Sequence, residues 1–323
     1  MLKNQKKFLY LFVLLGLMSC SADKSSDIEE IEAEIDSATL TSQKVEKKPY
    51  FVGTNPTPNG KKWKTVYKLT DEFSDNEINL EKWYTDPNAH PHLKWPGRLP
   101  ALFQSKRIKA NNGKMTIEVG KLGKPKTISP YGEPLTYTYY GGILRSKVTS
   151  TVGNYYECRM KMSKTEMGGG FWLMGFNNNC NKKHEIDITE SVGVLTPLTA
   201  EWAKRAKWDE IYHSNAIRRE NKCQEDSERA QGAVTTRTKN HERYYVYGFW
   251  WKSATELVFF LDGKEQYTLR PPVPFNQQMY LQFSIESYDW NPIPADGGKV
   301  ASASLKDRTC YVDYIRTFKL INK

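Results

Sequence analysis

The chain has 323 residues, of which 39% are hydrophobic and 13% aromatic, so it holds enough apolar material for a large core and is not intrinsically disordered. Its formal net charge is +10. A basic protein often binds nucleic acid, but the sequence contains no recognisable nucleic-acid-binding motif, and we expect no nucleic-acid partner. The charge fits an anionic polysaccharide, or a solvated surface with an excess of lysine.

The N-terminus is typical of an exported bacterial lipoprotein. Residues 1–7 are basic, and residues 8–18 form an apolar run that is too short to span a bilayer. The run ends in Leu17-Met18-Ser19-Cys20, which resembles a lipobox. We therefore expect a signal peptide over residues 1–20 with Cys20 as the lipidated residue; an ordinary signal that happens to contain Cys20 is the alternative. This predicts a protein at the outer membrane or cell surface, attached to the membrane only through its lipid.

Residues 21–48 are predicted to be an acidic flexible tether. They hold eight acids against four lysines and have no aromatic residue. Residues 1–20 carry three lysines, so a net charge of +11 remains on residues 49–323. The predicted folded domain is therefore strongly basic.

The other four cysteines have no metal-finger spacing, so a thiol-bound metal is not expected. Cys180 and Cys223 lie in polar, loop-like sequence, and a disulfide between them is possible in an oxidising compartment. Cys158 and Cys310 lie in strand-like runs and are predicted to be buried.

From Tyr50 onward, short aromatic and β-branched runs alternate with Gly, Pro and Asn, a pattern that predicts an all-β sandwich or barrel. In residues 155–163 the even-numbered side chains are apolar and share one face of a strand, and in residues 280–288 the odd-numbered positions 281, 283 and 285 do so. Asn112-Gly113 and Asp262-Gly263 each join two such runs and predict tight hairpin turns.

The hexapeptide of residues 185–190 places three carboxylates in one predicted strand. In a regular strand Ile186 and Ile188 would enter the core, and Glu185 and Asp187 would share the opposite face. Glu190 joins that face only if the strand contains a β-bulge. Crowded carboxylates repel, and the repulsion keeps one of them protonated near neutral pH. A pair such as Glu185 and Glu190 could therefore act as nucleophile and proton donor in glycoside hydrolysis, although half-exposed strands also carry solvated acids.

Residues 197–241 interrupt the strand pattern. Residues 200–207 could form a helix, and residues 218–230 are a charged run. We interpret the segment as an insertion in the domain, which either walls part of a binding cleft or forms a solvated loop.

The chain resembles glycoside hydrolase family 16 over about residues 60–320. The family motif E-[ILV]-D-x-x-E is matched by Glu185, Asp187 and Glu190. Further matches, in order, are Asp71-Glu72-Phe73, Gly141 to Lys147, Tyr155 to Met162, Phe171 to Met174, Tyr247 to Trp250 with Leu261-Asp262-Gly263, and Val312-Asp313-Tyr314.

The resemblance implies a β-jelly-roll with two curved antiparallel sheets and a concave substrate cleft. It also implies a retaining, endo-acting glycosidase in which Glu185 is the nucleophile, Glu190 the general acid and then base, and Asp187 an electrostatic helper. No cofactor is needed for this chemistry. Some members hold a structural calcium, for which Glu72 and Asp313 are candidate ligands.

Residues 95–103 resemble the family members that cut marine galactans, and Tyr212 to Asn215 and Ile285 to Ser287 resemble their cleft segments. In this interpretation Trp95 and Trp172 stack on sugar rings, and Arg98, His213 and Glu286 bind hydroxyl groups; each could instead be structural. We therefore expect a monomeric β-agarase that cleaves β-1,4 galactosidic linkages in agar. The alternatives are a porphyranase or carrageenase, a transglycosylase with the same intermediate, and a non-catalytic glycan-binding lipoprotein.

Overall fold

The computed structural model describes residues 47–176, 183–219 and 228–323. The predicted signal peptide, the tether up to residue 46, Cys20, Cys180 and Cys223 lie outside the described residues. Residues 47–323 cluster as one unit. None of the helices in the described part of the chain is both long and apolar enough to cross a bilayer.

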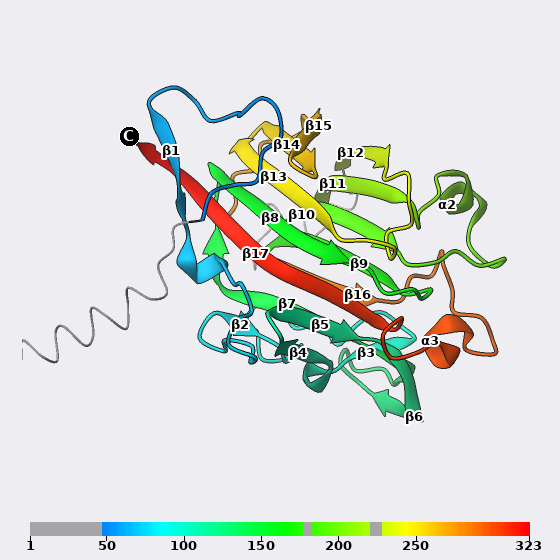
Figure 1. Cartoon of the computed structure of the whole chain (residues 1–323). Coiled ribbons are helices and arrows are strands. Elements are labelled where there is room, and N and C mark those ends of the chain that lie inside the picture. Colours follow the sequence, from blue (N-terminus) through cyan, green and yellow to red (C-terminus); the bar gives the residue numbers. More distant parts are fainter. Residues whose placement is uncertain (1–46, 177–182, 220–227) are drawn as a thin grey trace, which may run out of the picture. The chain divides into compact units, whose positions relative to one another are not determined.

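Two mainly antiparallel sheets make up the domain, which confirms the predicted all-β sandwich (Figure 1). In the described residues the first sheet has eight strands in the order β15, β14, β13, β8, β17, β5 and β4, with β1 also paired to β17. Their bounds are β1 Lys61–Thr65, β4 Ile108–Asn111, β5 Lys114–Glu118, β8 Asn154–Lys161, β13 Tyr245–Ser253, β14 Glu256–Leu261, β15 Lys264–Leu269 and β17 Thr309–Asn322.

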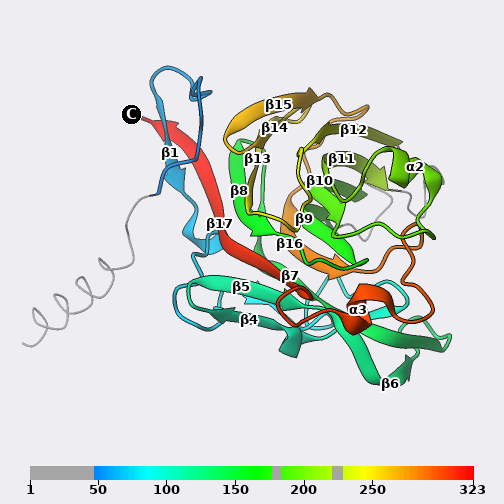
Figure 2. The same cartoon turned by 45° about the vertical axis from the view of Figure 1, so that its right-hand side comes forward.

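The second sheet has nine strands in the order β12, β11, β10, β9, β16, β7 and β2, with β3 and β6 also paired to β7. Their bounds are β2 Trp83–Tyr84, β3 Ala101–Phe103, β6 Gly120–Ile128, β7 Leu135–Ser150, β9 Gly168–Gly175, β10 Lys183–Val192, β11 Ile211–Arg219, β12 Glu228–Thr235 and β16 Met279–Glu286. Helices are short: η1 Tyr67–Leu69, η2 Ser105–Arg107, α2 Glu201–Arg205 and α3 Gly298–Ser302. Long strands of both sheets are curved (Figure 2).

The core lies between the sheets and uses the alternation seen in the sequence. Tyr156, Cys158 and Met160 of β8 and Leu281 and Phe283 of β16 are buried in it. Cys158 and Cys310 are buried free thiols, as predicted. Both hairpin turns are confirmed: Asn112 and Gly113 join β4 to β5, and both have positive φ, as a type I′ turn requires. Asp262 and Gly263 do the same between β14 and β15.

The opposite face of β8 differs from the simple alternation. Tyr155 and Glu157 are fully buried there, because residues 50–63 cover this part of the eight-stranded sheet. The backbone N–H of Tyr50 donates to Glu157 at 2.8 Å, and burial raises the pKa of Glu157 to about 7.

Residues 197–241 contain regular structure and line part of the cleft, so the solvated loop that was one of the two expectations for this segment is wrong. Residues 201–205 form α2, close to the predicted helix, but β11 and β12 extend the nine-stranded sheet as its edge. In β12 exposed and half-buried residues alternate, which is the pattern of an edge strand with one covered face. The segment is thus part of the scaffold.

Candidate active site

A cleft of about 850 Å³ lies on the nine-stranded sheet. Side chains of β7, β9, β10, β11, β12 and β16 line it, together with residues 92–95, Arg98, Tyr131, Trp202 of α2 and aromatic residues of the loops after β10 and β16. Its lining contains all eight predicted catalytic and substrate-binding residues: Trp95, Arg98, Trp172, Glu185, Asp187, Glu190, His213 and Glu286.

The three acids of β10 share the cleft face because the strand contains the expected bulge. The pairing with β11 shifts register between Asp187 and Glu190, and the pairing with β9 shifts between Asp187 and Thr189. Ile186 and Ile188 point into the core and are completely buried. The bulge therefore turns Glu190 back to the cleft after the isoleucines are packed.

Glycines of β9 permit this backbone path. A Cβ atom on Gly170 would lie 1.8 Å from the carbonyl oxygen of Thr189, inside the bulge. On Gly169 it would lie 1.8 Å from the carbonyl oxygen of Ser284 in β16. Any side chain here would force β10 or β16 away from β9, so the glycines set the strand spacing beneath the acids.

Glu185 is held by an arginine that the sequence analysis did not identify. Arg219, at the end of β11, donates from Nε to one carboxylate oxygen at 2.9 Å and from Nη2 to the other at 2.5 Å. This two-pronged pairing raises the pKa of the Arg219 guanidinium and fixes the orientation of the Glu185 carboxylate.

Asp187 and Glu190 are linked by an amide. Asn215 of β11 donates from Nδ2 to Asp187 Oδ2 at 3.1 Å and to Glu190 Oε2 at 3.3 Å. Burial and the negative charges of Glu185 and Glu190 raise the pKa of Asp187 well above its usual range. Burial also raises the pKa of Glu190, with Glu185 contributing in the same direction. The site thus favours the protonated form of carboxyls beside Glu185, which is what a proton donor needs.

Two further side chains flank Glu190. Tyr288 interacts with the Glu190 carboxyl and partly opposes the rise in the pKa of Glu190. His213 Nδ1 lies 3.7 Å from Glu190 Oε2. Burial lowers the pKa of His213 to about 4, so its imidazole is neutral at pH 7. The contact between His213 and Glu190 is therefore no ion pair at that pH.

The predicted sugar-contacting residues lie beside these acids. Trp172 faces the cleft and donates from Nε1 to Ser284 Oγ at 3.1 Å, while its neighbour Phe171 enters the core. Trp95 packs edge-on against Trp172 with 6.3 Å between ring centroids. Arg98 Nε donates to Glu286 Oε2 at 2.9 Å, and burial raises the pKa of Glu286 to about 7.

The cleft is rich in basic side chains. Six of its lining residues are Lys or Arg and four are Asp or Glu; the basic ones are Lys94, Arg98, Arg145, Lys183, Arg219 and Arg229. Arg145 is almost wholly buried and donates to neutral groups, the side chain of Gln282 at 2.8 Å and the carbonyl of Pro87 at 3.1 Å. Burial lowers the pKa of Arg145 to about 10, and it remains a cation at pH 7.

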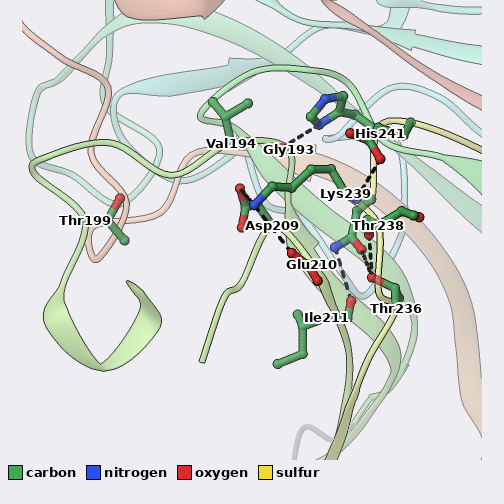
Figure 3. A network of polar contacts seen from close by, with 12 residues as sticks. Gly193, Val194, Thr199, Asp209, Glu210, Ile211, Thr236, Thr238, Lys239 and His241 are labelled. Carbon is green, nitrogen blue, oxygen red and sulfur yellow. Dashed lines mark hydrogen bonds and ion pairs between the residues drawn. The ribbon is translucent and has the colours of Figure 1, made fainter. Parts of the chain in front are cut away.

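A polar network holds the chain where it enters β11 (Figure 3). Lys239 reaches the carboxylates of Asp209 at 2.9 Å and Glu210 at 3.7 Å. Asn240 donates to the carbonyl of Ile211 at 3.1 Å, and His241 Nδ1 lies 2.9 Å from the carbonyl of Gly193. The loop between β12 and β13 thereby joins the end of β10 to the start of β11, the two strands that carry most of the acid site.

The two candidate calcium ligands are engaged elsewhere. Glu72 accepts two hydrogen bonds from Arg316, at 2.7 and 2.8 Å, and Asp313 accepts one from Arg159 at 2.6 Å. No group of three or more His, Cys, Asp or Glu residues suited to a metal occurs in the described ranges. Calcium needs six to eight oxygen ligands, so these two paired acids do not fit a calcium site as they stand.

Several cleft residues were missed from the sequence. Arg219 follows His213, Asn215 and Ile217 at every second position of β11, and that period could have revealed it. Tyr288, Trp208 and Trp290 come from loops and Trp202 from the short helix α2, where the sequence has no such period.

The family model and the known proteins to which this chain is similar agree on one family. The family model described as "Beta-porphyranase A-D, GH16 domain" matches residues 63–320. A β-porphyranase B of Zobellia galactanivorans is 37% identical over 281 residues, covering 85% of this chain and 91% of that protein. A β-porphyranase C of the same organism is 31% identical over 354 residues, covering 99% of each.

The solved structures agree. The crystal structure of porphyranase B from Zobellia galactanivorans superposes with a TM-score of 0.77 and 36% identity, covering 85% of this chain and all of that one. The described fold is therefore the predicted jelly-roll. A β-agarase A from that organism is more distant, with 23% identity over 83% of this chain and 48% of that protein.

Proposed function

This chain belongs to glycoside hydrolase family 16, and from that premise we propose that it is an endo-acting β-porphyranase with a retaining mechanism. The observation that carries the substrate assignment is the gradient of identity, which is higher to two β-porphyranases than to a β-agarase. It favours the porphyranase alternative over the agarase expected from the sequence.

The charge of the cleft supports a sulfated substrate. Lys94, Lys183 and Arg229 line it without an ion pair to any other described residue. The raised pKa values of Asp187, Glu190 and Glu286 further reduce the negative charge opposite them. A sulfated galactan would meet a positive cleft, whereas a neutral galactan gains nothing from it.

In the proposed reaction, Glu185 attacks the anomeric carbon while Glu190 gives its proton to the departing glycosidic oxygen. A covalent ester between the sugar and Glu185 results. Glu190, now a carboxylate, removes a proton from water, and that water releases the sugar with its original anomeric configuration. We propose that Arg219 orients Glu185, and that protonated Asp187 hydrogen-bonds the nucleophile and limits the negative charge around it.

The test compares porphyran, agarose, κ-carrageenan and laminarin as substrates, by release of reducing ends and by product mass. We expect oligosaccharides from porphyran above all. Glu185→Gln should lower kcat by at least about 10³-fold, whereas Glu265→Gln, which changes an exposed acid outside the cleft, should be neutral. Preferred cleavage of agarose would restore the agarase assignment, and binding without cleavage would favour a glycan-binding protein.

A second comparison separates the two acids. An activated aryl leaving group needs no proton, so Glu190→Gln should lose much less activity on an aryl glycoside of the preferred oligosaccharide than on the polysaccharide. Glu185→Gln should lose activity on both. Equal losses for the two variants on both substrates would contradict the assigned roles.

The lipoprotein assignment remains part of the proposal. It rests on the basic and apolar N-terminus and on Cys20. Labelling of the expressed chain by a radioactive fatty acid, lost in Cys20→Ser, would test it.

A further inference from the structure

Three tryptophans form a cluster at the Glu190 end of the acid strand. Trp202 of α2 lies 5.6 Å from Trp208 and 5.2 Å from Trp290 between ring centroids, and Trp208 lies 4.8 Å from Trp290. All three line the cleft. Trp208 is nearly buried and Trp290 half-buried, but Trp202 keeps 46% of its surface exposed.

The cluster is connected to Glu190 by two routes. Trp290 stacks on Tyr288 with 4.8 Å between ring centroids, and Tyr288 interacts with Glu190 in the cleft lining. Trp208 packs on His213 at 4.5 Å, and His213 contacts Glu190. The cluster therefore lies on the Glu190 side of the acid strand, whereas Glu185 is approached by Arg219 from the end of β11.

The exposed ring of Trp202 is held in position by its surroundings. The backbone N–H of Ala200 donates to the carbonyl of Trp290 at 2.8 Å, and the hydroxyl of Thr199 bonds to Asn291. Lys204 of α2 pairs with Glu201 of the same helix at 2.8 Å and donates to the carbonyl of Pro197, which precedes the helix, at 2.8 Å. A large ring that is fixed and exposed beside a polar cleft is ready to stack on a ligand without a further cost in conformational entropy.

We propose that Trp202 and Trp290 form a sugar-binding subsite for the leaving-group side of the galactan chain. Its ligand is the apolar C–H face of a galactose ring, which an indole face covers well. The position follows from chemistry, since Glu190 protonates the oxygen that departs with those sugars. This inference rests on the proposed function.

The same subsite would hold an acceptor in transglycosylation. There an acceptor hydroxyl replaces water: its oxygen bonds to the anomeric carbon, its proton passes to Glu190, and the ester bond to Glu185 breaks. A residue that binds the leaving-group side should therefore change the ratio of elongated to hydrolysed products.

The experiment measures KM and this product ratio on porphyran oligosaccharides. Trp202→Ala should raise KM about three- to tenfold and lower the share of elongated products, and Trp202→Phe should recover most of both. Leu198→Ala is the matched control, because Leu198 is 59% exposed in the same segment but does not line the cleft. It should behave as the unchanged protein.

Three results would overturn the proposal. An unchanged KM would show that Trp202 binds no sugar, and a raised KM with an unchanged product ratio would place the subsite on the other side of the scissile bond. A shifted pH profile in Trp202→Ala would show that the cluster acts through Glu190 instead.

Retardation of the protein in native gels that contain porphyran or agarose measures binding of the polysaccharide and needs no turnover. Measured in the Glu185→Gln background, it should weaken with Trp202→Ala and persist with Leu198→Ala, in whichever galactan retards the parent. This separates failure of the subsite from failure of the proposed function, which would appear as absent cleavage by the unchanged protein.

Discussion

Tyr288 controls how firmly Glu190 holds its proton. Its hydroxyl favours the ionised form of Glu190, against burial and against the charge of Glu185. Tyr288→Phe removes that hydroxyl, and the pKa of Glu190 should rise further. Because a general acid must be protonated, we expect the basic limb of the pH dependence of kcat/KM to move upward by about one pH unit.

Tyr131→Phe makes the same chemical change elsewhere in the cleft, at a side chain that is 66% exposed. In Tyr131→Phe, the basic limb of the pH dependence of kcat/KM should stay at the same pH. If Tyr288→Phe leaves the limb unmoved, or moves it to lower pH, Tyr288 does not act on the proton of Glu190.

At the residue scale, the sequence revealed what is local along the chain. Glu185, Asp187 and Glu190 fall within six residues, and the conflict between their spacing and a regular strand was enough to predict the bulge. The pairing of Arg219 with Glu185 joins positions 34 apart, and it depends on the register of β10 and β11. The period of two along β11 could have placed Arg219 on the cleft face, but the register between strands cannot be read from one sequence, so the pairing of Arg219 with Glu185 remained hidden.

At the scale of elements, β9 and β10 are fitted to each other through glycine. A methyl group on Gly170 would collide with the carbonyl oxygen of Thr189 in the bulge. Gly170 and Thr189 both belong to strands that pair with a neighbouring strand on each side, so neither backbone can easily move away. Gly170→Ala should therefore displace Glu190 and lower the free energy of unfolding by about 1–3 kcal/mol, with a larger proportional loss of kcat than of substrate affinity. Urea unfolding and steady-state kinetics measure the two effects.

Gly123→Ala is the matched control, since Gly123 also lies in a strand but has no atom within 4 Å of the added Cβ. Its stability should be unchanged or slightly higher, as expected when a strand glycine is replaced without a clash. Equal behaviour of the two variants would mean that the bulge tolerates a side chain at position 170.

Residues 197–241 show why two strands, β11 and β12, were not predicted. Their composition is polar and charged, which is common in loops, yet β12 is an edge strand whose solvent-facing side chains are naturally polar. The partner strand β11 is buried along most of its length, and the network around Lys239 fixes where it begins. Such a segment becomes a regular strand only by pairing with a neighbouring strand, and a single sequence does not show which strand that is.

At the scale of the whole molecule, charge and fold combine. Residues 49–323 carry a net charge of +11, and the cleft has more basic than acidic side chains. The charge alone left two interpretations open, a polyanionic ligand or a solvated surface. The excess of basic side chains in the cleft now favours the first, because a groove with low-dielectric protein walls focuses the field of its charges on a bound chain.

Salt distinguishes these interpretations. The screening length is about 10 Å at 0.1 M salt and about 3 Å at 1 M, so long-range attraction to a sulfated chain should largely vanish between them. We expect KM for porphyran to rise about three- to tenfold over this range and KM for agarose to change about twofold or less.

Lys94→Gln with Lys183→Gln should flatten the response of the porphyran KM to salt, because both exposed lysines line the cleft. Lys68→Gln with Lys306→Gln removes the same charge from exposed positions outside the cleft and should keep the response steep. If both pairs flatten it equally, the net charge attracts the polysaccharide without help from the cleft; if neither salt nor substitution alters KM, sulfate recognition is not electrostatic at long range.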